Sequence, residues 1–401
     1  MSSIIKQTLA MLRANLLSLP RRLPISLSMT ISIALVVCVL AGFLSMAKGF
    51  EKTLTGTGSP AVAVILGGGT NQESGSDMPA GAVRALEAMN SDIGVARDAA
   101  GNLVSSRELV VPVEVKPSED AGERTLALRG MEPAGLSLRD GVRLSAGRFF
   151  APGAREIVVG ARLAEEFPGF GVGDTIRLGA VDWRVAGHFS AKGSAFESEI
   201  WTGLDAVRAA FDRQGQVQSF RLRLVEPAAL KTLQNALGRV TGTPLVAISE
   251  ADLYAGQSSR TADLIRLLGW PIALLMAIGA TAGALNTMMS SVSDRTIEIA
   301  TVRAIGFNRL PAFAATWAEA TLLAAVGAAV GIAASWLAFS GWQASTIGAN
   351  NARMTFELAV TGDVMLTAGL LGLAIGIVGG ALPAIAATRL PLTAALRARG
   401  Q

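Results

Sequence analysis

Four segments of the chain are apolar enough and long enough to cross a lipid bilayer, which takes about 20 residues. Their expected limits are residues 23–47, 267–293, 310–341 and 364–388. The first segment could be a signal peptide, because it ends in the small-residue pattern Ser45-Met46-Ala47. Its apolar run is much longer than the roughly 7–15 residues of a signal peptide. We therefore expect an uncleaved membrane anchor at this position.

The composition of the whole chain agrees with this pattern. Of its 401 residues, 51% are hydrophobic and only 16% are charged, whereas a soluble domain usually carries about 25% charged residues. The net charge is +4, but the positive charges lie beside the apolar segments and form no basic stripe with interleaved aromatic residues. This distribution excludes nucleic-acid binding. The expected fold is that of a membrane protein with four transmembrane helices.

Basic residues beside the apolar segments predict the orientation of the chain, because short cytoplasmic segments are enriched in Lys and Arg. Three segments carry such an excess: residues 1–22, 294–309 and 389–401. The short loop at 342–363 instead contains one arginine and two acidic residues. We therefore expect both termini and the segment between the second and third spans to be cytoplasmic. The long segment at 48–266 should then be extracytoplasmic.

The extracytoplasmic segment alternates strand-like and helix-like runs that are separated by Gly-rich breakers, which is typical of an α+β domain. It is long enough to bury its own core, and we expect two lobes within it. Its last part, 257–266, is expected to be a stalk helix that continues into the second span, with Gly256 as a candidate break. Four acids are interpreted as solvent-exposed surface residues: Glu165, Glu166, Glu197 and Glu199.

Candidates for catalytic or metal-binding residues are few. The chain has one cysteine, Cys38, and one histidine, His188, which excludes an intrachain disulfide, a zinc site of the Cys/His type and most nucleophile–base pairs. No Gly-x-x-x-x-Gly-Lys-Ser/Thr motif occurs in the sequence, so the chain is not expected to hydrolyse ATP itself. The sequence predicts no catalytic site, and no cofactor or metal bound by this chain.

The N-terminal residues 1–22 mix apolar and polar positions at helical spacing. Such a helix can lie in the inner membrane interface with its Lys and Arg side chains toward the lipid head groups. It can equally extend the first span into the cytoplasm. Pro20 and Pro24 predict a break between this helix and the span.

Small residues recur at four-residue spacing inside three of the spans. The residues are Gly279, Gly283, Gly327, Gly331, Gly372, Gly376 and Gly380. Such spacing allows helix backbones to approach closely in lipid. Glycine is also simply common in membrane helices, but its recurrence in three spans favours a packed helical bundle.

The charged segment at 291–309, SVSDRTIEIATVRAIGFNR, predicts a short amphipathic helix. Ser293 or Asp294 can cap its start, and Gly306 suits its end. Arg295 and Glu298 are three residues apart and can pair. An apolar face is expected from the spacing of Ile297, Ala300, Thr301, Ala304 and Ile305. A simple loop needs neither caps nor an apolar face, so the pattern favours docking into a groove on a partner protein.

This segment is similar to the cytoplasmic coupling segment of ABC-transporter permeases of the macrolide-exporter and lipoprotein-release type. That superfamily works by mechanotransmission and also includes a cell-division permease. The shared pattern falls on Ser293, Asp294, Arg295, Glu298, Ile299, Val302, Arg303, Ala304, Ile305, Gly306 and Arg309. The resemblance extends to the order of one span, a large outer domain and three spans. It also covers Glu319 and the tail residues Pro391, Ala395, Leu396 and Arg397.

The resemblance implies a permease subunit of the bacterial inner membrane that dimerises, with itself or with a related permease. It would bind two copies of an ABC ATP-binding subunit, which would hold the ATP and Mg²⁺, and the 294–309 helix would dock into that subunit. Motion would reach the outer domain through the second span and would export or extract an amphiphile such as a drug, lipid, lipoprotein or peptide. The resemblance leaves open whether a periplasmic adaptor takes part.

Two other functions remain as alternatives. The first is a mechanotransmitting regulator that activates an extracytoplasmic enzyme such as a cell-wall hydrolase. The second is a receptor without an ATPase, which would leave the 294–309 helix without a function. Within the spans, Glu319 is a functional candidate by default. Because it lies only about 13 Å along the helix from Leu310, near the inner interface, we interpret it as a structural polar contact.

Overall fold

The protein is described by a computed structural model that covers residues 2–89, 93–116, 122–238, 244–347 and 352–389. The chain divides into two compact units. Unit 1 comprises Met1–Lys48, Asp263–Trp342 and Leu358–Gln401, and unit 2 comprises Gly49–Ala262 and Gln343–Glu357. The expected cytoplasmic tail, with Pro391, Ala395, Leu396 and Arg397, lies outside the described residues from position 390 onward.

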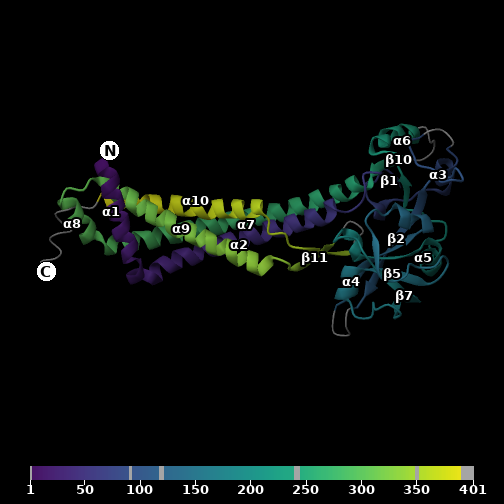
Figure 1. Cartoon of the computed structure of the whole chain (residues 1–401), viewed down its shortest axis with the longest axis horizontal. Helices are drawn as coiled ribbons and strands as arrows, with labels where there is room; N and C mark the ends of the chain where they lie inside the picture. Colours follow the sequence, from purple (N-terminus) through teal and green to yellow (C-terminus); the bar gives the residue numbers. More distant parts are fainter. Residues whose placement is uncertain (1, 90–92, 117–121, 239–243, 348–351, 390–401) are drawn as a thin grey trace. The chain divides into compact units, whose positions relative to one another are not determined.

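Unit 1 is a bundle of long helices (Figure 1). Its elements are α1 (Ser2–Ser18), the 3₁₀ turn η1 (Leu19–Arg22), most of α2 (Leu23–Thr55), most of α7 (Glu250–Asp294), α8 (Thr296–Ala304), α9 (Arg309–Phe339) and α10 (Gly362–Thr388). The last turns of α2 and the first turns of α7 belong to unit 2. The helices α2, α7, α9 and α10 are each long and apolar enough to span a membrane. The four helices and the large domain between the first and second of them confirm the predicted fold class.

The break before α2 follows the sequence pattern, whereas the start of α7 does not. The turn η1 contains Pro20 and separates α1 from α2, as expected from a residue that cannot donate a backbone hydrogen bond. Gly256 does not interrupt α7, so the expected stalk limit at 257 is wrong and the helix begins at Glu250. The Ser249 hydroxyl accepts a 3.0 Å hydrogen bond from the Asp252 amide, a contact that starts helices. Its stabilisation offsets the cost of about 1 kcal/mol for a helical glycine.

The glycines of α9 and α10 lie where helix backbones meet. A Cβ added at Gly331 would lie 2.5 Å from the carbonyl oxygen of Ala34 in α2, and one at Gly376 would lie 2.1 Å from the Cβ of Ala324 in α9. A Cβ at Gly327, Gly372 or Gly380 would also meet an atom of a neighbouring helix, at 2.8, 2.5 and 2.4 Å respectively. Because these distances are too short for any side chain, the five glycines hold α2, α9 and α10 together.

The two glycines of α7 behave differently. A Cβ at Gly279 or Gly283 would meet no atom within 4 Å, so the expectation that they pack against another helix is wrong for contacts within the described chain. The packed face of α7 instead carries Ala273, Ala277 and Ala284, which join the core of the bundle.

A leucine at Gly376 is therefore expected to destabilise the bundle by at least about 1–3 kcal/mol, the usual cost of overpacking. A leucine at Gly279 should leave stability unchanged or raise it slightly, since glycine is a poor helix former. Thermal unfolding of the purified protein in lipid nanodiscs compares the two variants. Equal midpoints for Gly376→Leu and Gly279→Leu would contradict this packing.

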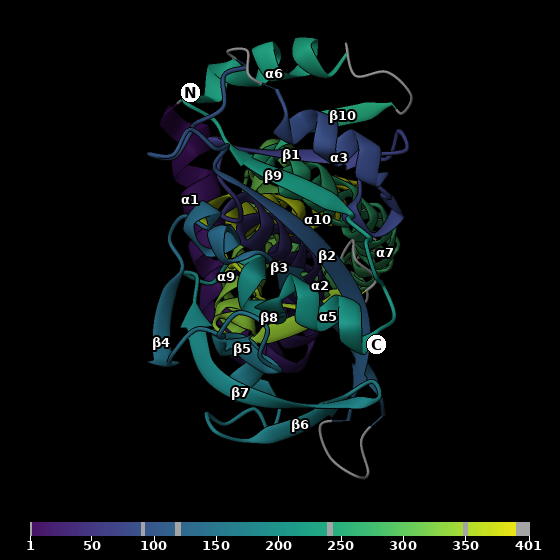
Figure 2. The ribbon, with the colours of Figure 1, turned by 90° about the vertical axis from the view of Figure 1, so that its right-hand side faces the viewer.

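Unit 2 is built on one ten-stranded sheet (Figure 2). The strands are β1 (Val62–Gly67), β2 (Ser105–Val115), β3 (Arg124–Met131), β4 (Arg143–Gly147), β5 (Glu156–Gly160), β6 (Thr175–Leu178), β7 (Val181–Ser190), β8 (Glu199–Gly203), β9 (Ser219–Arg223) and β10 (Leu245–Ser249). Their order is β10-β1-β9-β2-β3-β8-β5-β7-β4, and β6 pairs with β7. Pairing is antiparallel except for β3 with β8 and β5 with β7.

The helices of unit 2 are short. They are α3 (Ala80–Glu87), α4 (Ala161–Glu166), α5 (Leu204–Ala210) and α6 (Leu230–Leu237), with the 3₁₀ turns η2 (Glu73–Gly75), η3 (Pro133–Leu138), η4 (Ala195–Ser198) and η5 (Pro227–Ala229). One apolar cluster joins β2, β3, β5, β7 and β8 to α4 and α5, and another joins β1, β9 and β10 to α3 and α6. These clusters are the cores of the two expected lobes, but a single sheet runs through both.

The segment expected to be a short external loop, 342–363, contains an antiparallel hairpin. Its strands are β11 (Gln343–Ile347) and β12 (Arg353–Glu357), and both belong to unit 2. In β12, Phe356 is fully buried and packs edge-on against Phe50 with ring centroids 5.3 Å apart. The expected loop therefore contains strand structure, and the contact of Phe356 with Phe50 anchors β12 in unit 2.

Candidate coupling site

The segment predicted to dock a partner forms α8, but its start differs from the prediction. Ser293 and Asp294 are the last residues of α7, and Arg295 occupies the position before the first turn of α8. No side chain caps this start. The predicted cap at Ser293 or Asp294 is therefore wrong. The start of α8 is instead held by a backbone hydrogen bond, in which the Ile299 amide donates to the Arg295 carbonyl at 2.9 Å.

The end of α8 follows the sequence pattern. Gly306 has a φ of +109°, a conformation that glycine adopts without strain. Its amide donates to the Arg303 carbonyl at 3.1 Å, and the Phe307 amide donates to the Val302 carbonyl at 3.4 Å, which satisfies carbonyls at the helix end. Arg309 is not part of this helix, since it is the first residue of α9.

One side of α8 is packed inside unit 1. Ile299 is buried in a cluster with Met11 of α1 and Ala312 of α9, and the next residue, Ala300, is fully buried. Val302 lies at the edge of this cluster. The helix is therefore held on the bundle by residues from the N-terminal helix as well as from its own neighbours in the chain.

The other side of α8 is exposed. Ile297 is 38% and Ile305 is 77% exposed, and Thr301 and Ala304 are exposed beside them. Of the apolar face expected from the sequence, only Ala300 is buried. The exposed side also carries Glu298, whose side chain is 65% exposed. The described helix thus presents isoleucines and a carboxylate to its surroundings.

A buried polar cluster fixes the start of α8. Arg295 is 6% exposed, and its guanidinium pairs with Glu298 at 3.4 Å and with Glu319 of α9 at 3.1 Å. Arg295 also donates to the Asn15 side-chain oxygen, and the Asn15 amide donates to Glu319 at 2.8 Å. Glu319 is therefore a structural polar contact that links α1 and α9 to the α7–α8 junction.

Further polar contacts tie this region to the other helix ends. Arg303 of α8 donates to the Thr388 carbonyl at the end of α10, at 3.1 Å. Arg22 donates to the Ser291 carbonyl near the end of α7, at 2.9 Å. Within unit 1, α8 therefore contacts α1, α7, α9 and α10.

Unit 2 contains a second polar cluster, a buried ion-pair network that sequence reasoning missed. Its side chains are 9% exposed or less. The members are the carboxylates of Glu73, Glu108, Glu199 and Glu250 and the guanidiniums of Arg129, Arg139 and Arg221. Glu250, the first residue of α7, pairs with Arg221 at 2.5 Å and with Arg139 at 3.1 Å. The network therefore fastens the start of α7 to the sheet.

Two of the buried carboxylates, Glu73 and Glu108, have lowered pKa values, which favours their ionised form. Burial by itself raises the pKa of Glu73, but the nearby Arg129 and Arg221 outweigh it and hold this pKa well below the usual range. The pKa of Glu108 is also lowered, because Arg139, Arg221 and Arg129 together outweigh its burial.

These lowered pKa values predict how stability depends on pH. As the pH falls below about 4.5, the unfolded chain takes up protons at Glu73 and Glu108 before the folded one does, so the free energy of unfolding decreases. A Cys38→Ala, Ala63→Cys protein reports unfolding of unit 2, since Ala63 is fully buried. The reaction of this cysteine with dipyridyl disulfide across a urea series measures the free energy of unfolding of unit 2 at each pH. Glu73→Gln should make the free energy of unfolding depend less steeply on pH below about 4.5. If this dependence is unchanged, the pKa of Glu73 is not lowered in the folded protein.

Two acids expected at the surface are buried. Glu199 belongs to the network, and Glu197 is 5% exposed and accepts hydrogen bonds from the Ala191 and Gly193 amides. The signal for burial was present in the strands, where Arg129 lies within the apolar run TLALRGM and Arg221 within SFRLRLV. A charged residue in such a run has a partner when both faces of the strand are covered. In the described part of the chain, no group of three or more acidic, Cys or His residues suits a metal ion.

Two family models match the chain. The MacB-like periplasmic core domain matches residues 26–240, which is more than half of the chain. The FtsX-like permease C-terminal model matches residues 271–392, which include α8, α9 and α10.

Curated relatives carry the name macrolide export ATP-binding/permease protein MacB. The protein of Bdellovibrio bacteriovorus is 26% identical over 407 residues, which cover 92% of this chain and 58% of that protein. The protein of Rhodopseudomonas palustris is 27% identical over 274 residues, which cover 64% of this chain and 41% of that protein. The chain thus spans about half the length of the curated relatives it matches.

Solved structures show partial likeness. The periplasmic region of MacB from Actinobacillus actinomycetemcomitans aligns with a TM-score of 0.37 and 13% identity, covering 51% of this chain and 94% of that one. The extracellular domain of the noncanonic ABC-type transporter YknZ from Gram-positive bacteria aligns with a TM-score of 0.33 and 13% identity. That alignment covers 46% of this chain and 99% of the other.

Proposed function

Because this chain belongs to the ABC-transporter permeases with a MacB-like periplasmic core and an FtsX-like C-terminal domain, we propose that it is driven by a separate ATP-binding subunit. As a permease it is not itself the ATPase. In the proposed assembly the chain forms a dimer in the bacterial inner membrane, with both termini and α8 in the cytoplasm. Each copy binds one ATP-binding subunit, which holds ATP and Mg²⁺.

The observation that carries this proposal is the two-sided character of α8. Its inner side is fixed by Ile299 and by the Arg295–Glu319 ion pair, whereas its outer side presents Ile297, Ile305 and Glu298. A helix that exposes apolar side chains on a firmly held backbone is suited to dock into a groove of a partner. Exposed loops without a partner do not need such anchoring.

The path for motion is the continuous helix α7. It runs from Glu250 to Asp294, and a continuous helix transmits displacement along its length because it is stiff. One end adjoins α8 through Arg295, and the other is fastened to the sheet of unit 2 by the ion pairs of Glu250. ATP-driven displacement of α8 would therefore act on unit 2, which would export or extract an amphiphilic substrate.

The test is purification of the full chain after co-expression with candidate ABC ATP-binding subunits lacking a permease domain. The proposal expects one such subunit to co-purify and its ATPase activity to respond to amphiphilic substrates in nanodiscs. Failure of every encoded candidate to bind would contradict the proposal. Binding without substrate stimulation, together with dependence of a cell-wall hydrolase on the permease, would favour the regulatory alternative.

A further inference from the structure

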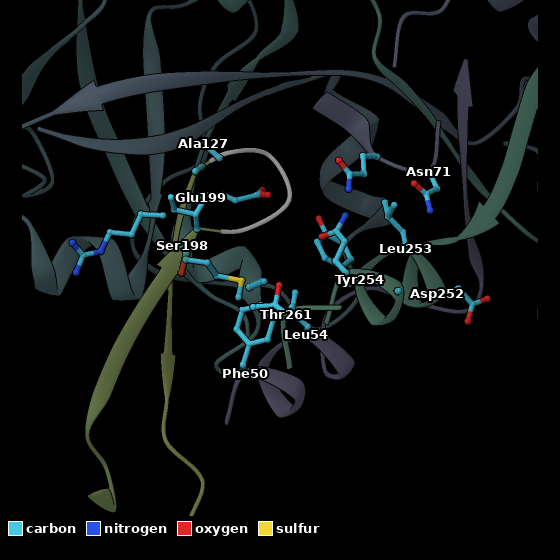
Figure 3. A pocket seen from close by; sticks show the side chains of 18 of the residues that line it. Phe50, Leu54, Asn71, Ala127, Ser198, Glu199, Asp252, Leu253, Tyr254 and Thr261 are labelled. Atoms are coloured by element: carbon cyan, nitrogen blue, oxygen red, sulfur yellow. The ribbon is translucent and has the colours of Figure 1, made fainter. Parts of the chain in front are cut away.

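Unit 2 contains a cavity of about 300 Å³ (Figure 3). The proposed transmission of motion through α7 does not involve this cavity. Its walls come from the last turns of α2, the first turns of α7, the hairpin strand β12 and the sheet strands β3 and β8. All the described residues that line it belong to unit 2. The volume is at the lower end of the range for small-molecule sites, roughly 300–1,000 Å³.

One wall of the cavity is apolar and tightly packed. It is formed by Phe50 and Leu54 of α2, Leu253 of α7 and Met354 of β12, each 6% exposed or less. The edge-on contact between Phe50 and Phe356 holds this wall in place. Such a surface gains free energy when an apolar group replaces water against it.

The rest of the lining is polar, and most of its polar groups are uncharged. Asn71, Gln72 and Gln257 supply carboxamides, and Thr261 supplies a hydroxyl. A carboxamide offers both donors and an acceptor. A ligand with hydroxyl or amide groups can therefore satisfy them in either direction.

Two of the three charged groups of the lining, Glu199 and Arg353, already form ion pairs. Glu199 accepts from Arg129 at 2.7 and 2.8 Å and from the Trp201 indole at 2.7 Å. Arg353 pairs with Glu166 at 2.7 Å. Asp252 accepts from the Ser249 hydroxyl at 2.6 Å, and its carboxylate points away from the space between Glu199 and Tyr254 (Figure 3).

We propose that this cavity binds an uncharged amphiphile. Its apolar part lies against Phe50, Leu253 and Met354, and its hydroxyl- or amide-bearing head meets the carboxamides of Gln72 and Gln257. A charged head is disfavoured, because it would lose hydration where Glu199 and Arg353 are already ion-paired and the Asp252 carboxylate points away (Figure 3). That this ligand is the exported substrate rests on the proposed function. Binding of the ligand in the cavity does not depend on that function.

The test uses the full chain in nanodiscs and three photoreactive amphiphiles. All three share a diazirine-bearing octyl chain, and their heads are glucose, trimethylammonium and carboxylate. Labelled sites are mapped by peptide mass spectrometry. We expect the glucoside to label peptides that contain Leu253 or Met354 about tenfold more than either charged probe, which corresponds to a difference of about 1.4 kcal/mol.

Two helical glycines provide a matched pair of variants. A Cβ at Gly256, in the cavity lining, or at Gly81, on α3, would meet no atom within 4 Å, so an added side chain starts in open space at both positions. Gly256→Phe should abolish labelling of the cavity peptides, and Gly81→Phe should leave it unchanged. Gln257→Glu should shift the preference toward the trimethylammonium probe.

Three results would overturn the inference: equal labelling by all three heads, labelling only of the spans, or no effect of Gly256→Phe. None of them depends on the ATP-binding subunit. Conversely, a chain that binds the glucoside as expected but recruits no ATP-binding subunit would contradict the proposed function alone. The two failures are therefore distinguishable.

Discussion

Replacing Ile305 by glutamate is expected to weaken binding of the ATP-binding subunit by about 30-fold, the effect of losing roughly 2 kcal/mol at an interface hot spot. Ile305 is 77% exposed on α8, so the substitution adds a charge to the docking face without disturbing the core of unit 1. ATP-dependent activity should fall in proportion at limiting subunit concentration. Titration of the purified permease in nanodiscs with the ATP-binding subunit measures the change.

A matched control is Val225→Glu, since Val225 is 71% exposed and lies in unit 2. It introduces the same charge at a similarly exposed apolar residue and should leave the affinity unchanged. If Ile305→Glu binds as tightly as the unmodified chain, or if both variants lose affinity equally, α8 is not the docking element.

Removal of one buried carboxylate should have the largest effect on stability. Glu108→Ala is expected to lower the free energy of unfolding of unit 2 by about 3–5 kcal/mol, because it breaks three buried ion pairs and removes an acceptor of buried guanidinium N–H groups. Glu108 pairs with Arg139 at 2.7 Å, Arg221 at 2.8 Å and Arg129 at 3.0 Å. Thiol reactivity at Ala63→Cys, in the Cys38→Ala background, measures the loss across a urea series.

The control for this prediction is an ion pair near the surface of the same sheet. Asp140 pairs with Arg223 at 2.8 Å, and its side chain is 54% exposed. Asp140→Ala should cost only about 0–1 kcal/mol, as is usual for exposed pairs. A similar loss in both variants would show that the buried network is no more important to stability than a surface pair.

The membrane helices could be predicted because they depend on local properties of the sequence. A long apolar run requires a span, and Pro20 and Gly306 mark turns through their own backbone restrictions. The limits of α7 were less predictable. Gly256 suggested a break, but the contact between Ser249 and Asp252 starts the helix earlier.

The polar clusters could not be located from the sequence, because their members are far apart along the chain. Asn15, Arg295 and Glu319 meet only when α1 and α9 pack against the α7–α8 junction. In unit 2, Glu73 meets Arg221 across 148 positions. The order of the strands determines such pairs, and one sequence without relatives does not specify that order.

The apolar face of α8 illustrates the same limit at short range. The helical spacing correctly placed Ile297, Thr301 and Ile305 together, but it did not show which side of the helix the bundle covers. Burial of Ile299 against Met11 decides this, and it leaves Ile297 and Ile305 exposed rather than packed.

Cross-linking from α8 tests the central claim most directly. In a Cys38→Ala background, a photoreactive thiol reagent is attached to Thr301→Cys on α8 or to Gln214→Cys in unit 2, both exposed positions. The chain is then irradiated in cells that express the ATP-binding subunit. The account predicts a cross-link to that subunit from position 301 and none from position 214. A cross-link from position 214, or none from position 301 while the subunit co-purifies, would contradict it.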